Sequence, residues 1–176
     1  MQLKKLFFAL AILMAAIVAI SNFLVQFPVY YLGMENILTY AAFTYPITFL
    51  ITDLANRKYG KFIARKIVYL GFFTGIILTI FFSTNFDDLI SIRIAIGSAT
   101  AFLVAQLLDV SIFDLLRKKI WFVAPIISSL LGSVVDTFLF FSISFYNTEI
   151  PWLSLAIGDF IVKIIISLLM LIPFRV

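Results

Sequence analysis

The chain has no cysteine and no histidine among its 176 residues, and only 12% of its residues are charged. The absence of cysteine excludes disulfides, thiolate chemistry and a lipoprotein anchor. Histidine is the side chain best suited to bind metals or to relay protons near neutral pH, so any titrating relay has to use carboxylates instead. We therefore predict neither a metal site nor a cofactor.

Motifs for enzymatic chemistry are absent as well. The sequence contains no Walker A motif for ATP hydrolysis, no HExxH zinc motif and no GxSxG nucleophile elbow. Ser129 and Ser133 lie in an apolar segment without any histidine to act as a base, and a dyad with Lys163 is a weak alternative. We predict that the protein is not an enzyme.

Hydrophobic residues, by contrast, make up 64% of the chain and include 21 phenylalanines, and the mean hydropathy is +1.16. Soluble domains are roughly half apolar and about a quarter charged, and a soluble protein of this composition would expose large apolar patches. The composition therefore indicates a membrane protein. The net charge of +4 does not indicate a nucleic-acid partner, because the cations lie beside hydrophobic runs.

Six apolar segments are long enough to cross a bilayer, which takes about 20 residues. They lack the alternating polarity of barrel strands, so we predict helices joined by short loops. The first segment could instead be a signal peptide, although its apolar stretch is longer than usual. We expect one membrane domain over residues 1–176, with spans at Leu6–Phe27, Ile37–Asp53, Ile67–Ser83, Ile92–Leu115, Trp121–Phe145 and Trp152–Ile172.

The charges predict how these spans are oriented. Of the 13 Lys and Arg residues, all except Arg93 and Lys163 lie at the chain ends or in the loops after the second and fourth segments. The opposite loops carry acidic residues such as Glu35 and Asp88. By the positive-inside rule, we predict an all-α bundle of six transmembrane helices with both termini in the cytoplasm.

Small residues recur at helical spacing. Gly71 and Gly75 form a GxxxG pattern in the third segment, and Gly97 and Ala101 continue the same spacing in the fourth. Because lipid tails are as apolar as leucine, membrane helices associate through such small residues. We interpret the pattern as packing within one bundle, and a homo-oligomer formed through Gly71 and Gly75 remains the alternative.

Polar side chains at membrane depth are costly and indicate function. In the fourth segment, Phe102, Gln106 and Asp109 share one helical face. In the fifth segment, Asp136 and Phe140 share a face well inside the hydrocarbon. The structural alternatives are that Asp109 pairs with the basic cluster after the fourth segment and that Asp136 makes a hydrogen bond between helices.

Two further places carry buried charge. Asp159 and Lys163 have the i,i+4 spacing of an intrahelical ion pair, and Lys163 is the only cation predicted at the middle of the bilayer. Pro46 predicts a kink or opened backbone seven residues before Asp53, and broken helices often line transport cavities. Asp53 and Asn56 could instead cap the cytoplasmic end of their helix and meet Arg57 or Arg65.

The stretch from Thr48 to Arg65, which reads TFLITDLANRKYGKFIAR, closely resembles the LITD…YG…AR signature of the queuosine precursor transporters, also called the vitamin uptake transporter family. Gln106–Lys118, Ser133–Phe140 and Gly158–Phe174 are similar to the family's later helices, so the resemblance covers nearly the whole chain. Two positions depart from the pattern. Arg57-Lys58 stands where many members are acidic, and Val134-Val135 replaces a Ser-Gln pair.

The resemblance implies import of queuosine precursors, which are cyano- or aminomethyl-substituted 7-deazaguanine bases used in tRNA modification, across the bacterial inner membrane. A guanine-like edge offers two adjacent N–H donors to a buried carboxylate, and its carbonyl can accept from an amide or ammonium group. Aromatic rings would stack on the base. On this basis the expected substrate-binding residues are Asp136, Asp109, Gln106, Lys163, Phe140, Phe102 and Asp53.

Two other functions remain open at this stage. A basic six-helix protein of this size also resembles the substrate-binding subunit of an energy-coupling-factor importer, which needs an ATPase module as a partner. A bundle that only stabilises another membrane complex is the third interpretation. Beyond the solute and the lipid bilayer, the sequence predicts no specific partner.

Overall fold

The computed structural model describes residues 2–175, and nearly all of them are helical apart from the connections. Within this range there is no β-strand, only an isolated bridge between Pro28 and Thr39. By length and hydropathy, 5 helical segments can cross a bilayer. They are α1 (Gln2–Leu24), α4 (Lys61–Phe82), α5 (Leu89–Leu116), α6 (Val123–Phe145) and α7 (Trp152–Leu169), the last continued by α8 (Leu171–Arg175).

The second predicted span differs from the expectation of one helix over Ile37–Asp53. It consists of a short α2 (Ala41–Thr44) and a longer α3 (Ile47–Tyr59), with the break at Pro46. Proline has no backbone N–H and its ring clashes with the preceding turn, so the helix cannot run through this position. The predicted kink is confirmed, but the predicted boundaries are wrong, because α3 continues past Asp53.

The third predicted span also begins earlier than expected. We expected it to start at Ile67, but α4 starts at Lys61, directly after Gly60. Gly60 has a φ of +83°, a left-handed conformation that favours glycine and that separates α3 from α4. The basic residues after Gly60 therefore belong to the first turns of a helix rather than to a loop.

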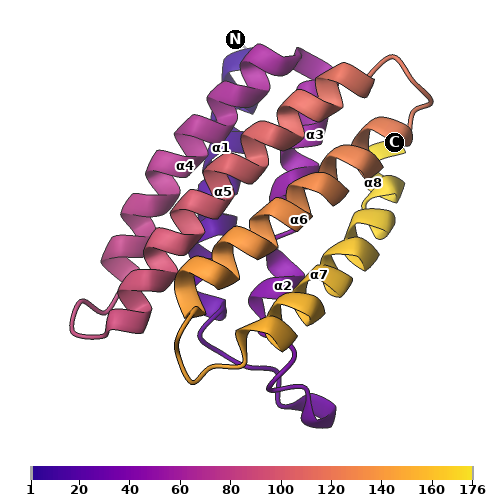
Figure 1. The fold of residues 1–176 in the computed structure, drawn as a ribbon. Helices are drawn as coiled ribbons and strands as arrows, with labels where there is room; N and C mark the ends of the chain where they lie inside the picture. The colour runs from indigo at the N-terminus through magenta and orange to yellow at the C-terminus, as the bar shows by residue number, and fades with distance from the viewer. Residues whose placement is uncertain (1, 176) are drawn as a thin grey trace.

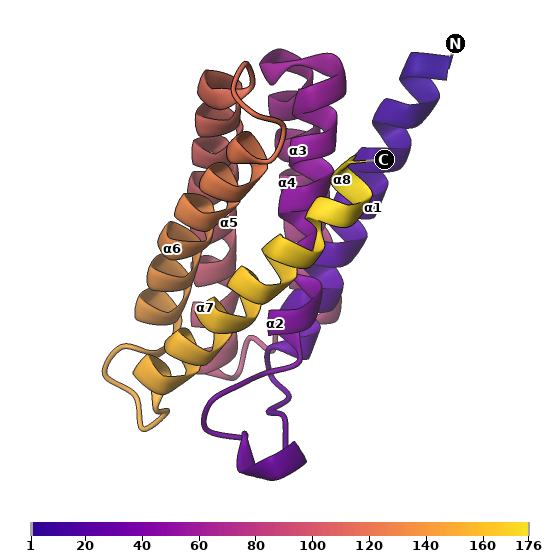
Figure 2. The same ribbon diagram turned by 90° about the vertical axis from the view of Figure 1, so that its right-hand side faces the viewer.

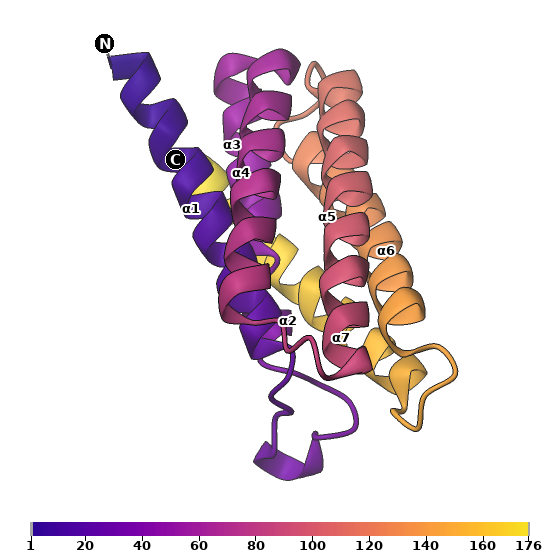
Figure 3. The same cartoon turned by 90° about the vertical axis from the view of Figure 1, so that its left-hand side faces the viewer.

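The helices are arranged around the broken helix α2–α3. The most extensive pairs are α5 with α6 and α1 with α4 (Figure 1). Helix α7 crosses diagonally in front of α2 and α3, between α6 and α1 (Figure 2). Figure 3 shows α1 running beside α4, and below them the long connection from α1 to α2, which includes the short 3₁₀ helix Tyr31–Gly33.

The two ends of the bundle differ in charge. The connections α3–α4 and α5–α6, the start of α1 and the end of α8 lie together at what we call the basic end (Figure 1). The other connections, residues 25–40, 83–88 and 146–151, form the acidic end. Arg175 of α8 lies 5.4 Å from the ring centroid of Trp121 in the α5–α6 connection, which places the end of α8 at the basic end.

The GxxxG pattern packs within the bundle, as predicted. A Cβ atom at Gly71 or Gly75 would meet Met14 or Val18 of α1, with Cγ1 of Val18 only 3.1 Å away. The glycines thus let α1 and α4 approach closely. Because α1 occupies this face, Gly71 and Gly75 are not free to form a dimer interface.

Gly158 makes the tightest approach and gives the first testable prediction. A Cβ there would overlap the backbone carbonyl oxygen of Ile37, which cannot move away by changing rotamer. Gly158→Ala should therefore destabilise the fold by about 1–3 kcal/mol and lower the melting temperature in detergent. Ile157→Val, a change at an exposed position on the same helix, is the control. Equal melting temperatures for the two variants would contradict this packing.

Candidate functional site

A buried ion cluster joins α6 and α7 near the middle of the bundle. Lys163 Nζ lies 2.5 Å from Asp159 Oδ2, which confirms the predicted i,i+4 pair. It also donates to Asp136 Oδ2 at 2.7 Å, so the hydrogen bond between helices that we gave as the structural alternative for Asp136 is present, with a partner that the spacing did not predict. With both carboxylates ionised, the cluster carries one more negative charge than positive.

Two uncharged residues complete the cluster. The hydroxyl group of Tyr45 donates to Asp136 Oδ1 at 3.0 Å, and Lys163 Nζ lies 5.2 Å from the centroid of the Tyr45 ring. Thr137 accepts from Lys163 at 3.1 Å and donates to Asp159 at 2.8 Å. Both oxygens of Asp136 are thus satisfied. Sequence reasoning missed Tyr45, and the only signal for it was its place beside the helix-breaking Pro46.

The ion cluster faces a small hollow, which we call the central cavity. Its volume is about 30 Å³, and Phe140 and Phe141 also line it. That is room for about two water molecules. Val25 and Thr39 line both the central cavity and a second cavity of about 370 Å³, which lies at the acidic end and which we call the vestibule. The two cavities are therefore neighbours.

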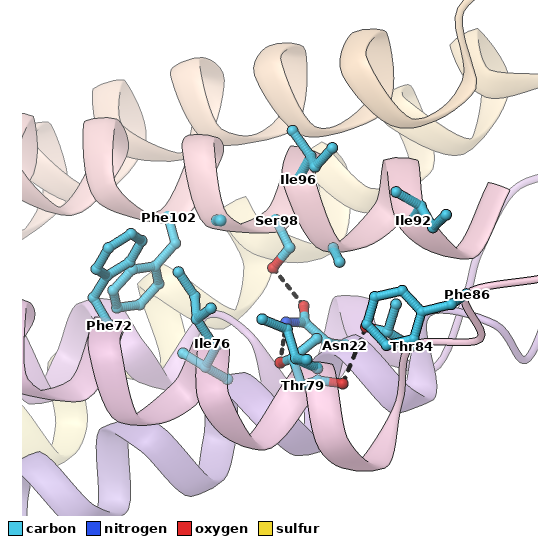
Figure 4. Close-up of a pocket in the computed structure, with 14 residues that line it drawn as sticks. Asn22, Phe72, Ile76, Thr79, Thr84, Phe86, Ile92, Ile96, Ser98 and Phe102 are labelled. Atoms are coloured by element: carbon cyan, nitrogen blue, oxygen red, sulfur yellow. Dashed lines mark hydrogen bonds between the residues drawn. The ribbon is translucent and has the colours of Figure 1, made fainter. Parts of the chain in front are cut away.

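Asn22 of α1 links the central cavity to a groove on the side of the bundle. Its side chain donates to Thr79 at 2.8 Å and accepts from Ser98 at 2.5 Å (Figure 4). The groove, of about 230 Å³, lies between α4 and α5 and is almost entirely apolar. Phe102 lies in this groove, stacked on Phe72 with ring centroids 6.2 Å apart, and not in the central cavity.

Gln106 is fully buried and is satisfied within the bundle. Its Nε2 donates to the Thr48 hydroxyl at 2.9 Å, and its Oε1 accepts from Thr52 at 2.5 Å. Thr48 and Thr52 lie one turn apart on α3, so this layer joins α3 to α5. Gln106 is not among the residues that line the central cavity.

Asp53 and Asp109 form a separate group nearer the basic end. Asp53 accepts from Ser128 at 3.3 Å and from Ser129 at 3.2 Å, and its carboxyl group is close enough to that of Asp109 to interact electrostatically. Neither oxygen of Asp109 has a hydrogen-bond partner among residues 2–175. Of the seven predicted binding residues, therefore, only Asp136, Lys163 and Phe140 lie at the central cavity.

The structural alternatives for these two aspartates are wrong. Asp109 does not pair with the basic cluster after α5, because Arg117 of that cluster pairs with Asp114 at 3.2 Å. Asp53 does not cap a helix, because it lies in the middle of α3. Of the two suggested partners, Arg57 instead donates to the backbone carbonyl of Phe174, and Arg65 donates to the Ser111 hydroxyl at 3.2 Å.

The chain is similar to one protein family and to several bacterial proteins. The family described as "Putative vitamin uptake transporter" matches residues 39–176. A "Probable queuosine precursor transporter" from Haemophilus influenzae is 37% identical to the chain, over 89% of the chain and 79% of the relative. The "Queuosine precursor transporter" of Escherichia coli is 32% identical, over 98% of the chain and 86% of the relative. No solved structure matches the chain.

Proposed function

Because the chain belongs to the vitamin uptake transporter family, we propose that it imports queuosine precursors, the cyano- and aminomethyl-substituted 7-deazaguanine bases, across the bacterial inner membrane. It is a multi-pass membrane transporter and not an enzyme. The observation that carries the substrate assignment is that relatives named for this substrate align with most of the chain, at 30% to 37% identity.

We propose six membrane crossings in a single domain, with both termini in the cytoplasm. Five of the crossings are the long apolar segments, and the broken helix α2–α3 is the sixth. The basic end carries residues such as Arg57 and Lys118, and the acidic end carries Glu35 and Asp88, so the positive-inside rule favours a cytoplasmic basic end. The vestibule then opens to the outside, where an imported solute arrives.

In this proposal Asp136 and Lys163 recognise the guanine-like edge of the base. Asp136 already accepts from two donors, Tyr45 and Lys163. The adjacent N–H groups of the base can replace both, since a carboxylate binds paired donors well. Lys163 then turns to the base carbonyl while keeping Asp159 and Thr137. Asp136 and Lys163 each exchange one partner for another, which limits the cost of desolvation.

The base must widen the central cavity, because about 30 Å³ holds only water. The vestibule is more than ten times larger, at about 370 Å³, and it accommodates the base first. Passage past Val25 and Thr39 requires α1 and α2 to separate from α6 and α7. Phe140, at the central cavity, is the proposed stacking partner. We assign no contact with the base to Phe102, Gln106, Asp53 or Asp109.

Gln106→Leu distinguishes a structural role of Gln106 from a binding role. Without Gln106, the Thr48 hydroxyl keeps its bond to the backbone carbonyl of Tyr45 at 2.7 Å, and the Thr52 hydroxyl turns its hydrogen to the backbone carbonyl of Thr48, 3.0 Å away. We therefore expect a loss of only about 1 kcal/mol of stability and an unchanged affinity for the base. Thermal unfolding and binding assays on the purified protein measure both. A loss of affinity of about tenfold or more would show that Gln106 contributes to binding the base.

The experiment that tests the function uses a bacterial host that neither makes queuosine precursors nor carries its own importer. Expression of this chain, with nanomolar precursor in the medium, should restore queuosine to the host tRNA, as measured by mass spectrometry of digested nucleosides. Asp114→Asn, which lies outside the central cavity, is the control and should restore queuosine as the wild type does. Absence of queuosine despite confirmed membrane expression would contradict the proposal.

A further inference from the structure

The strongest unexplained feature is the pair of carboxyl groups of Asp53 and Asp109, which we call the acidic pair. The two side chains come from α3 and α5 and are 2% and 0% exposed. Ser128 and Ser129 donate to Asp53, whereas both oxygens of Asp109 lack a hydrogen-bond partner in the part of the chain that the structure describes. A fully buried carboxyl group that has no hydrogen-bond donor is unusual in a folded protein and needs a physical explanation.

No cation balances the acidic pair among the described residues. From α4, Arg65 donates to Ser111 at 3.2 Å. At the end of α5, Arg117 pairs with Asp114, and Arg57 on α3 is held by the Phe174 carbonyl. The polar contacts of the acidic pair with α6 come from hydroxyl groups, those of Ser128 and Ser129. Two neighbouring carboxylates in a medium of low dielectric constant cannot both stay ionised without a partner.

The acidic pair is separate from the ion cluster but mechanically connected to it. Ser129 and Asp136 are seven residues apart on α6, a rise of about 10 Å, and Tyr45 and Asp53 bracket the first turns of α3. Both sites therefore span the same contact between α6 and the broken helix. A shift of α3 against α6 that opens the central cavity also changes the surroundings of Asp53.

We propose that the acidic pair binds one proton and couples import of the base to the proton gradient, an inference that rests on the proposed function. One carboxylate oxygen takes up a proton from water and donates it, as O–H, to the other carboxylate. The proton returns to water when α3 and α6 part at the basic end. Asp53 and Ser129 line a cavity of about 10 Å³ at that end, with room for about one water molecule.

A proton fits the site better than a metal ion does. None of the four cavities described above, in the part of the chain that the structure describes, is lined by both Asp53 and Asp109, whereas a shared proton needs no cavity. No group of three or more Asp, Glu, His or Cys side chains that could hold a metal occurs in the same range. The oxygens of Asp109 need a donor, and a proton on either carboxyl group supplies one.

The experiment uses the purified chain in liposomes with the membrane potential clamped, labelled 7-cyano-7-deazaguanine as a neutral probe, and a pH dye in the lumen. With the lumen one pH unit more alkaline than the medium, the wild type should accumulate the probe up to about tenfold. The lumen should acidify only when probe is added. Asp109→Asn should lose both effects but still exchange labelled for unlabelled probe.

Asp114→Asn is the matched control, because Asp114 is a half-exposed aspartate on the same helix. It should accumulate the probe and move protons as the wild type does. Wild-type uptake without acidification, or accumulation driven by a sodium gradient alone, would overturn the proton site and leave import intact. Neither uptake nor exchange by the wild type would instead refute the proposed function. The dye signal of the wild type shows whether uptake of the probe moves protons, and it does so even if Asp109→Asn does not fold.

Discussion

Replacing Asp136 by asparagine should lower the affinity for 7-deazaguanine bases by at least about 100-fold while leaving the protein folded. The carboxylate accepts two charge-assisted hydrogen bonds from the base in our proposal, and each is worth about 1.5–3 kcal/mol. An asparagine has the same shape but turns an N–H group towards one of these donors. Folding should survive because Lys163 and Asp159 remain as a balanced pair, 2.5 Å apart.

Binding of labelled base to the purified variants measures this effect, with Asp114→Asn as the control. A base analogue sharpens the test. Wild-type protein should bind 7-deazahypoxanthine, which lacks the exocyclic amine, at least about tenfold more weakly than 7-deazaguanine, because one bond to Asp136 is lost. Asp136→Asn should no longer discriminate between the two. Equal affinities of the wild type and Asp136→Asn for 7-deazaguanine would refute this site.

Lys163→Met should have the largest effect on stability. The ammonium group is 3% exposed and is the cationic partner of both Asp136 and Asp159. Methionine fills similar space but leaves two buried carboxylates without a counter-ion. Removal of one partner from a buried ion pair costs about 3–5 kcal/mol. We expect little monodisperse protein in detergent, and a strongly lowered melting temperature for what remains.

A second substitution shows whether the stability lost in Lys163→Met is due to the unbalanced buried charge or to altered packing. The double variant Lys163→Met/Asp159→Asn removes one of the two buried carboxylates and leaves Asp136 with the Tyr45 hydroxyl as a donor. This double variant should recover part of the stability lost in Lys163→Met, but it should not recover binding of the base. Lys118→Met, at an exposed position in the α5–α6 connection, controls for the loss of a lysine as such. A Lys163→Met protein as stable as the wild type would show that the cluster does not hold α6 and α7 together.

Much of the fold follows from local features of the sequence. The long apolar runs predicted α1, α5, α6 and α7 closely, because hydrophobic length is set by the bilayer itself. Pro46 predicted the break between α2 and α3, because the missing N–H acts within one turn. The spacing of Asp159 and Lys163 predicted their ion pair for the same reason, since both residues lie on one helix.

The partners of the polar contacts between helices did not follow from the sequence. The bond from Lys163 to Asp136 and the bond from Tyr45 to Asp136 depend on how α3, α6 and α7 are rotated against each other. Asn22 gave little signal as a single amide near a helix end, yet it joins α1 to α4 and α5. Spacing along one helix carries no information on such rotations, so the sequence could not show which of the predicted site residues lie at the central cavity.

The most direct test of the account is uptake of labelled 7-cyano-7-deazaguanine by liposomes that contain this chain and no other protein. We predict saturable uptake without ATP, competition by unlabelled 7-deazaguanine, and loss of uptake in Asp136→Asn but not in Asp114→Asn. Uptake that appears only after an ATPase module is added, or that persists at wild-type rates in Asp136→Asn, would contradict an independent importer that binds its solute at the ion cluster.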